Sequence, residues 1–156
     1  MKKIKKIAVY AGSFCPFTKG HEDIVMRALP LFDIIHIAVA CNSAKNDIFT
    51  VKQRVAWIEE LYKDNPKIKV CSYGGLTSNF CSVIGASYLI RGVRNGHDFT
   101  YEQNIADVNR QLNPELDTVV FISSPDKSFI SSSLVRELWK NRVDYSKYVS
   151  YKLPKL

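Results

Sequence analysis

The chain has 156 residues, of which 46% are hydrophobic, and this is enough to bury the core of one domain. We therefore expect residues 1–156 to form a single domain. The 22 basic and 15 acidic residues give a net charge of +7, which favours a polyanionic partner: a nucleotide, a nucleic acid or an anionic membrane surface. The cysteines show neither metal-ligand spacing nor a disulfide pattern, so reduced thiols in a cytoplasmic protein are expected at Cys15, Cys41, Cys71 and Cys81.

The N-terminus is basic, but it does not read as an export signal. The apolar run that follows residues 1–6 is short and ends in Gly12 and Ser13 without a cleavage-like site. Elsewhere, no uninterrupted apolar stretch approaches the roughly 18 residues that a transmembrane helix needs. The sequence therefore predicts a cytoplasmic protein without a membrane partner.

Strand-like and helix-like segments alternate along the chain. Short apolar runs typical of strands buried on both faces occur at residues 7–11, 34–41, 68–72, 88–90 and 118–122. Helical patterns fill the gaps at about 20–32, from Thr50 onward, and at 78–85, 98–112 and 131–140. No hairpin dipeptide separates the apolar runs. This order predicts an α/β fold: one doubly wound, Rossmann-like domain with a five-stranded parallel sheet.

Two helix boundaries have recognisable signals. Pro30 is expected to end or bend the first helix, because proline lacks the amide hydrogen that a helix interior needs. The second helix begins with Thr50 and Gln53 at capping-box spacing.

Polar residues follow each predicted strand, at the edge where a doubly wound sheet binds its ligands. They are Gly12-Ser13 with His21, the stretch 42–45, Gly74-Gly75, the stretch 91–94, and Ser123-Ser124 leading to 130–133. Each has a structural alternative: Lys45 as a solvated charge, Arg91 and Arg94 as surface ion-pair partners, and the serines as a helix cap. Their convergence on one edge favours a phosphate-rich ligand.

The stretch from Gly12 to His21 is the strongest single signal. Small residues at a strand end let backbone amides approach a phosphate, and the following helix adds the positive end of its dipole. The alternative is an ordinary strand-to-helix loop with a packed histidine.

Four stretches carry a resemblance to a known family. Residues 12–21 (GSFCPFTKGH), 90–94 (IRGVR), 98–102 (DFTYE) and 128–136 (SFISSSLVR) are similar to phosphopantetheine adenylyltransferase, and the similarity runs nearly end to end. The first stretch is shared with the wider nucleotidyltransferase superfamily and indicates only the reaction class. The resemblance implies a nucleotidyltransferase fold, the synthesis of dephospho-coenzyme A and pyrophosphate from ATP and 4'-phosphopantetheine with Mg²⁺, and a homohexamer.

The resemblance also implies roles for individual residues. Ser13 and Phe14 would lie beside both substrates, and His21 would stabilise charge on the α-phosphate of ATP. Lys45 and Arg91 would act in catalysis by holding the phosphate of phosphopantetheine, whose arm Thr77 would touch. The remaining ATP site would comprise Gly92, Val93, Arg94, Glu102, Lys127, Ser128, Phe129, Ile130, Ser131, Ser132 and Ser133.

Four positions depart from the family pattern. Cys15 replaces an acidic residue, Thr77 a larger apolar residue, Thr100 a glutamate and Lys127 a frequent aromatic residue. We therefore expect altered contacts in the first loop, along the pantetheine arm and beside adenine. His36, inside an apolar run, is expected to be structural, and His97 is expected in a loop without a visible partner.

The expected chemistry needs no enzyme nucleophile. The acceptor phosphate is already anionic and pyrophosphate is a good leaving group, so positioning and charge neutralisation suffice. No acidic cluster suggests a protein metal site, and Mg²⁺ is expected to be held mainly by ATP oxygens and water. His21 could donate a hydrogen bond either neutral or protonated.

Three other functions remain open at this point. Another nucleotidyltransferase, acting on nicotinamide mononucleotide or using CTP, would also fit residues 12–21. A nucleic-acid-binding module is favoured only by the net charge, because no recognisable binding motif is present. A catalytically inactive relative is disfavoured by the presence of His21, Lys45, Arg91 and Arg94.

Overall fold

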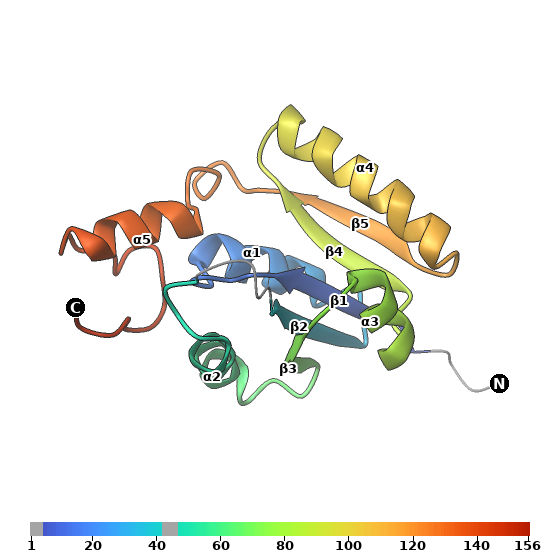
Figure 1. Ribbon diagram of the computed structural model, residues 1–156, viewed down its shortest axis with the longest axis horizontal. Helices are drawn as coiled ribbons and strands as arrows, with labels where there is room; N and C mark the ends of the chain where they lie inside the picture. The colour runs from blue at the N-terminus through green and yellow to red at the C-terminus, as the bar shows by residue number, and fades with distance from the viewer. Residues whose placement is uncertain (1–4, 42–46) are drawn as a thin grey trace.

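The computed structural model describes residues 5–41 and 47–156. Strands and helices alternate along the chain (Figure 1). The strands are β1 (Ile7–Gly12), β2 (Ile34–Ala40), β3 (Ile68–Tyr73), β4 (Tyr88–Val93) and β5 (Asp117–Ile122). The helices are α1 (Lys19–Ala28), α2 (Val51–Tyr62), α3 (Thr77–Ile84), α4 (Gly96–Leu112) and α5 (Ser132–Lys140). Among the described residues no helix is long and apolar enough to cross a membrane.

The five strands form one sheet in the order β3-β2-β1-β4-β5, and every neighbouring pair is parallel. The predicted doubly wound sheet is thus confirmed. The chain builds outward from β1 to β3 and then returns to place β4 on the other side of β1. The strand order therefore reverses between β1 and β4, and such a switch point is where this class of sheet binds its ligands.

The sheet is covered on both faces, because the residues of its central strand alternate between two cores. Ala8 and Tyr10 of β1 face the core that α1 and α2 complete. Val9 and Ala11 face the second core, to which α3 contributes Cys81. Burial on both faces explains why the strands read as nearly continuous apolar runs.

A third apolar cluster joins α5 and the C-terminal segment to the loop after β1. It contains Cys15, Phe49, Val135, Val149 and Leu153, with Trp57 and Trp139 packed against it. The rings of Phe49 and Trp139 meet edge to face with centroids 5.0 Å apart. This cluster holds α5 beyond the carboxyl ends of the strands, beside the start of α1 (Figure 1).

Two helix boundaries follow the signals predicted from the sequence. α1 ends at Ala28 with Leu29 as its C-cap, directly before Pro30, so the helix is shorter than the predicted 20–32. The capping box of Thr50 and Gln53 is present at the start of α2. The fourth strand is present, but its predicted end is wrong: β4 extends through Val93, so residues 91–93 lie within the strand and not after it.

Candidate active site

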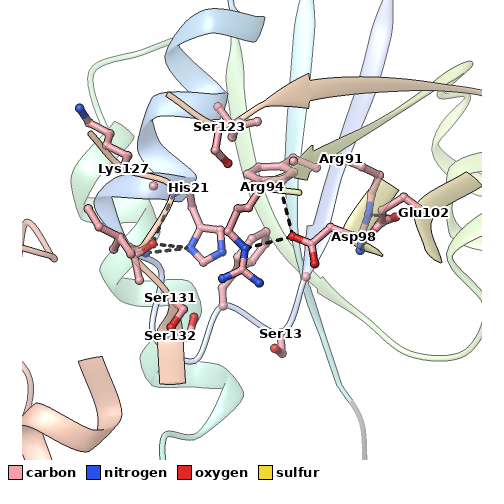
Figure 2. A pocket seen from close by; sticks show the side chains of 18 of the residues that line it. Ser13, His21, Arg91, Arg94, Asp98, Glu102, Ser123, Lys127, Ser131 and Ser132 are labelled. Carbon is pink, nitrogen blue, oxygen red and sulfur yellow. Dashed lines mark hydrogen bonds and ion pairs between the residues drawn. The ribbon is translucent and has the colours of Figure 1, made fainter. Parts of the chain in front are cut away.

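A cavity of about 490 Å³ opens at the carboxyl edge of the sheet, between the ends of β1 and β4. We call it the edge cavity. It brings together the first turn of α1, the start of α4 and the segment that leads into α5 (Figure 2). The predicted site residues that line it are Ser13, Phe14, His21, Arg91, Gly92, Arg94, Glu102, Lys127, Ile130, Ser131 and Ser132.

Residues 12–18, which we call the motif loop, turn sharply from β1 into α1. A Cβ on Gly12 would lie 2.8 Å from the Phe14 ring, so only glycine fits there. Phe14 itself adopts a positive φ of 46°, a conformation that non-glycine residues rarely take. The loop is therefore tight, and the buried Phe14 and Phe17 rings pack edge to face inside it with centroids 5.0 Å apart.

Distant side chains hold the backbone of the motif loop at several carbonyls. Arg136 Nη1 donates to the Cys15 carbonyl at 2.7 Å, and Ser132 Oγ donates to the Pro16 carbonyl at 2.7 Å. The Tyr151 hydroxyl donates to the Phe17 carbonyl at 2.7 Å. The donors come from α5 and the C-terminal segment, so these distant parts of the chain fix the shape of the loop.

His21 belongs to the capping box at the start of α1. The Thr18 amide donates to His21 Nδ1 at 2.9 Å, and the Thr18 hydroxyl lies 3.1 Å from the same nitrogen. The imidazole stacks on Phe17 with centroids 5.2 Å apart. Because Nδ1 accepts these bonds, the ring proton is on Nε2, and the ring lines the edge cavity.

The surroundings of His21 favour its neutral form. Burial, together with the positive charges of Arg91 and Arg94, lowers the pKa of the imidazole to about 4. The sequence left the protonation state open. At neutral pH the structure assigns His21 as a neutral donor at the positive end of the α1 dipole.

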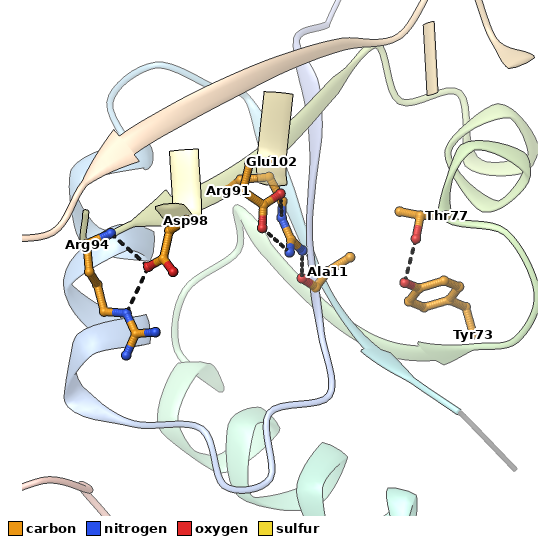
Figure 3. A network of polar contacts seen from close by, with 7 residues as sticks. All are labelled: Ala11, Tyr73, Thr77, Arg91, Arg94, Asp98 and Glu102. Atoms are coloured by element: carbon orange, nitrogen blue, oxygen red, sulfur yellow. Dashed lines mark hydrogen bonds and ion pairs between the residues drawn. The ribbon is translucent and has the colours of Figure 1, made fainter. Parts of the chain in front are cut away.

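Arg91 is held rigidly in the wall of the cavity. Its Nε and Nη2 donate to the two carboxylate oxygens of Glu102 at 2.7 and 2.6 Å, and Nη1 donates to the Ala11 carbonyl at 2.8 Å (Figure 3). Burial alone would lower the pKa of the guanidinium, but the hydrogen bonds and charge of Glu102 outweigh it, so the pKa is raised. Arg91 therefore stays charged, and Glu102 serves as its partner.

Arg94 is held more loosely at the mouth of the cavity. Its Nε and its backbone amide both donate to Asp98 Oδ2 at 3.1 Å, while 44% of its side chain remains exposed. Figure 2 shows the guanidinium lying beside His21. Lys127 also lines the cavity, and its ammonium pairs with Asp126 at 2.5 Å. The guanidinium of Arg94 keeps N–H groups that Asp98 does not occupy, so it can bind an anion in the cavity.

The serines at the start of α5 have separate tasks. Ser131 is the N-cap, and its hydroxyl accepts a hydrogen bond from the Leu134 amide at 3.1 Å. Ser132 binds the motif loop, and Ser133 accepts a hydrogen bond from Arg136 at 3.1 Å. The alternative of a helix cap is thus correct for Ser131, which also lines the cavity.

Several predicted site residues do not line the edge cavity. Val93 is buried in the sheet, Ser128 donates to the Pro125 carbonyl, and Phe129 packs against Tyr148. Thr77 begins α3 and hydrogen-bonds the Tyr73 hydroxyl at 2.8 Å, apart from the arginine network (Figure 3). Ser133 also lies outside the lining, and Lys45 falls outside the described residues.

Ser123, which was expected at the ligand-binding edge, also lines the cavity, whereas the lining residues Tyr10, His97, Asp98 and Tyr101 were given no role from the sequence. The prediction that His97 lies in a loop is wrong, because His97 lies in the first turn of α4. The Asn95 side chain caps this helix by accepting a hydrogen bond from the Asp98 amide at 2.9 Å, and asparagine is a residue type that favours a helix N-cap. Tyr10 is buried beneath the cavity, and burial raises the pKa of its hydroxyl.

The cavity supplies cationic and neutral donors more than metal ligands. Among the residues that the structure describes, no group of three or more His, Cys, Asp or Glu side chains could hold a metal ion. Glu102 and Asp98, the carboxylates lining the cavity, are paired with arginines. The remaining cationic and neutral donors suit an anionic ligand.

A doubly wound sheet with a cationic cavity at its switch point and a histidine at the first helix start defines a nucleotidyltransferase-like protein. The cytidylyltransferase-like family matches residues 9–138. The chain is 45% identical to the phosphopantetheine adenylyltransferases of Cytophaga hutchinsonii, over 96% of this chain and 100% of that one, and of Porphyromonas gingivalis, over 96% and 95%.

A bifunctional NMN adenylyltransferase/ADP ribose pyrophosphatase from Francisella tularensis superposes with a TM-score of 0.73 at 16% identity, covering 97% of this chain and 46% of that one, and so shares the fold. The relatives found by sequence identify the family within this fold. The chain belongs to the phosphopantetheine adenylyltransferase family and is a nucleotidyltransferase of coenzyme A biosynthesis.

Proposed function

We propose that this chain transfers the adenylyl group of ATP to 4'-phosphopantetheine, giving dephospho-coenzyme A and pyrophosphate. The observation that carries the proposal is the edge cavity, where a neutral histidine, two arginines and a helix N-terminus meet in a chain 45% identical to enzymes named for this reaction. A phosphate-rich pair of substrates matches this arrangement of donors.

The reaction is a direct displacement at phosphorus. An oxygen of the phosphopantetheine phosphate forms a bond to the α-phosphorus of ATP, and the bond from that phosphorus to the bridging β-phosphate oxygen breaks. The electron pair leaves with pyrophosphate. Neither step needs an enzyme nucleophile, so the protein contributes orientation and charge neutralisation.

His21 acts as a donor to the α-phosphate. Its proton is on Nε2 because Thr18 occupies Nδ1, the ring lines the cavity, and its low pKa keeps it neutral at physiological pH. The ring is fixed before substrate arrives, so the donor needs no reorganisation when charge develops in the transition state.

The arginines divide the remaining work. Arg91 has used three of its five N–H groups on Glu102 and Ala11, which leaves two for the phosphate of phosphopantetheine. Lys45 is proposed to bind the same phosphate. Arg94 and Lys127 bind the polyphosphate of ATP, and Mg²⁺ bound to that polyphosphate supplies further charge neutralisation.

We also propose that the protein is cytoplasmic and assembles as a homohexamer. The outer side of α4 supports self-association, because Ile105, Val108 and Leu112 lie on one helix face with 38%, 52% and 53% of their surfaces exposed. Light scattering at micromolar concentration should give a hexamer. A stable monomer would contradict this assembly.

The test of the reaction is pyrophosphate release from Mg-ATP, with phosphopantetheine, nicotinamide mononucleotide and glycerol 3-phosphate offered separately, and with CTP replacing ATP in a parallel set. Phosphopantetheine with ATP should be the productive pair. Turnover restricted to nicotinamide mononucleotide or to CTP would point to another nucleotidyltransferase. Salt-sensitive binding of nucleic acid without turnover would favour a nucleic-acid-binding module.

A further inference from the structure

Arg54 has the largest of the side chains that are fully buried among the described residues, with 2% of its surface exposed. It lies in the first turn of α2 and does not line the edge cavity. A buried cation is destabilising unless its hydrogen-bonding groups find partners. Its partners therefore indicate what holds it there.

The guanidinium of Arg54 connects three segments. Nη1 donates to the Ser13 carbonyl at 2.5 Å, Nη2 pairs with Asp47 Oδ2 at 3.0 Å, and Nε donates to the Thr50 carbonyl at 3.4 Å. Asp47 and Thr50 precede α2, whereas Ser13 lies 41 residues away in the motif loop. The ion pair neutralises the buried charge, and the carbonyl contact fixes the loop.

The Ser13 carbonyl belongs to the peptide that leads into Phe14, the residue with positive φ. Arg54 therefore stabilises the least favourable turn of the motif loop without lining the cavity itself. The carbonyls of residues 15, 16 and 17 are held by Arg136, Ser132 and Tyr151. Arg54 is the donor that extends this anchoring to Ser13, which lines the cavity.

We propose that Arg54 is a positioning residue for adenylyl transfer: it touches no substrate, and through the Ser13 carbonyl it fixes the cavity side of the motif loop. This inference rests on the proposed function. A displacement of the loop by about 1 Å can lower turnover by about 100-fold, so loss of the Ser13 contact should reduce kcat.

The test separates positioning from burial of charge. Arg54→Met alone leaves Asp47 unpaired and should lower the melting temperature. Arg54→Met combined with Asp47→Asn removes both charges and should restore most of that loss. The double variant should nevertheless keep kcat about 10- to 100-fold below wild type, with the KM for ATP within several-fold.

Two further variants keep the test decisive if the double variant folds poorly. Arg54→Lys retains the buried charge, but its single ammonium lacks the planar fork that binds Ser13 and Asp47 together, so kcat should fall at least about 10-fold. Arg110→Lys, at an exposed arginine paired with Asp117, is the matched control and should leave kcat unchanged.

Wild-type turnover of ATP with phosphopantetheine, measured beside the variants, tests the proposed function independently. If wild type is inactive, the proposed function fails. If wild type is active and either Arg54→Lys or the folded Arg54→Met/Asp47→Asn double variant has near wild-type kcat, the positioning role is wrong and Arg54 serves only stability.

Discussion

The motif loop and the corner between β4 and α4 form two walls of the same cavity in different ways. In the loop, neutral backbone carbonyls are held by side chains from α2, α5 and the C-terminal segment. In the corner, the cations are held by carboxylates close in sequence: Arg91 by Glu102 and Arg94 by Asp98. The motif loop therefore fixes the shape of one wall of the cavity, whereas the corner supplies positive charge that is partly neutralised before substrate binds.

The largest effect is expected at His21, where the loop meets α1. His21→Gln should lower kcat by about 10²- to 10³-fold with KM values within several-fold, because the amide N–H of glutamine does not take the position of the imidazole Nε2–H that is aimed at developing charge. Stability should be nearly unchanged, since Gln53 closes the equivalent capping box in α2 by accepting the Thr50 amide at 2.9 Å.

His21→Ala is the companion variant. Its kcat should fall by the same factor as in His21→Gln. Loss of the helix cap should also lower the free energy of unfolding by about 1 kcal/mol, which corresponds to a fall of roughly 2–4 °C in melting temperature. Both quantities should be measured on one active-site-titrated preparation. A destabilised His21→Ala enzyme with normal kcat would show that His21 only packs.

Substitutions in the corner between β4 and α4 should change substrate binding and stability together. Arg91→Ala should raise the KM for phosphopantetheine by about 10-fold or more, whereas ATP binding survives. It also leaves Glu102 uncompensated at 9% side-chain exposure, so the melting temperature should fall by several degrees. Arg91→Ala with Glu102→Gln should recover stability without recovering substrate use. Weakened ATP binding with unchanged phosphopantetheine affinity would contradict the placement of Arg91.

Substitution of the exposed Arg94 should affect ligand binding without the loss of stability that is expected for the more buried Arg91. Because 44% of its side chain is exposed and its pair with Asp98 is loose, Arg94→Ala should change the melting temperature little. The KM for ATP should rise about 10-fold, the value of one charge-assisted hydrogen bond. Calorimetric titration with ATP checks this, and unaltered ATP affinity would remove Arg94 from the nucleotide site.

The smallest effect is expected where the corner packs against α1. A Cβ on Gly92 would lie 3.3 Å from Cγ1 of Ile24, so Gly92→Ala should destabilise the fold by about 1 kcal/mol. Denaturant unfolding measures this. Combining it with Ile24→Val should recover part of the loss, and additive losses would show that crowding is not the cause.

Sequence reasoning was most successful where the signal is local. The parallel sheet followed from apolar runs buried on both faces, and the capping box at the start of α2 followed from the spacing of Thr50 and Gln53. The start of α4 was placed at residue 98, whereas the helix begins at Gly96, a poor helix former, with Asn95 as its N-cap. His97 was consequently assigned to a loop.

What the sequence could not supply is the set of long-range contacts. The bond from Arg54 to Ser13 joins residues 41 apart, and the bond from Arg136 to Cys15 joins residues 121 apart, with no pattern to link them. The low pKa of His21 likewise depends on burial and on Arg91 and Arg94, which only the fold brings near. Lys45 stays a prediction from resemblance.

The pKa of His21 also determines how stability depends on pH. Because the folded-state pKa of about 4 lies below the ordinary 6.5, the unfolded state binds more protons between these values. The contribution of His21 to stability is therefore complete above about pH 6.5 and is lost as the pH falls toward 4. His21→Gln should remove this part of the acid dependence.

The most direct test of the account is the ¹⁵N spectrum of the His21 imidazole, recorded as the pH is lowered from 8 to about 4. We expect a neutral ring with its proton on Nε2 at pH 7 and a titration midpoint near pH 4. An imidazolium at neutral pH, or a ring protonated on Nδ1, would contradict the neutral donor on which the proposed catalysis depends.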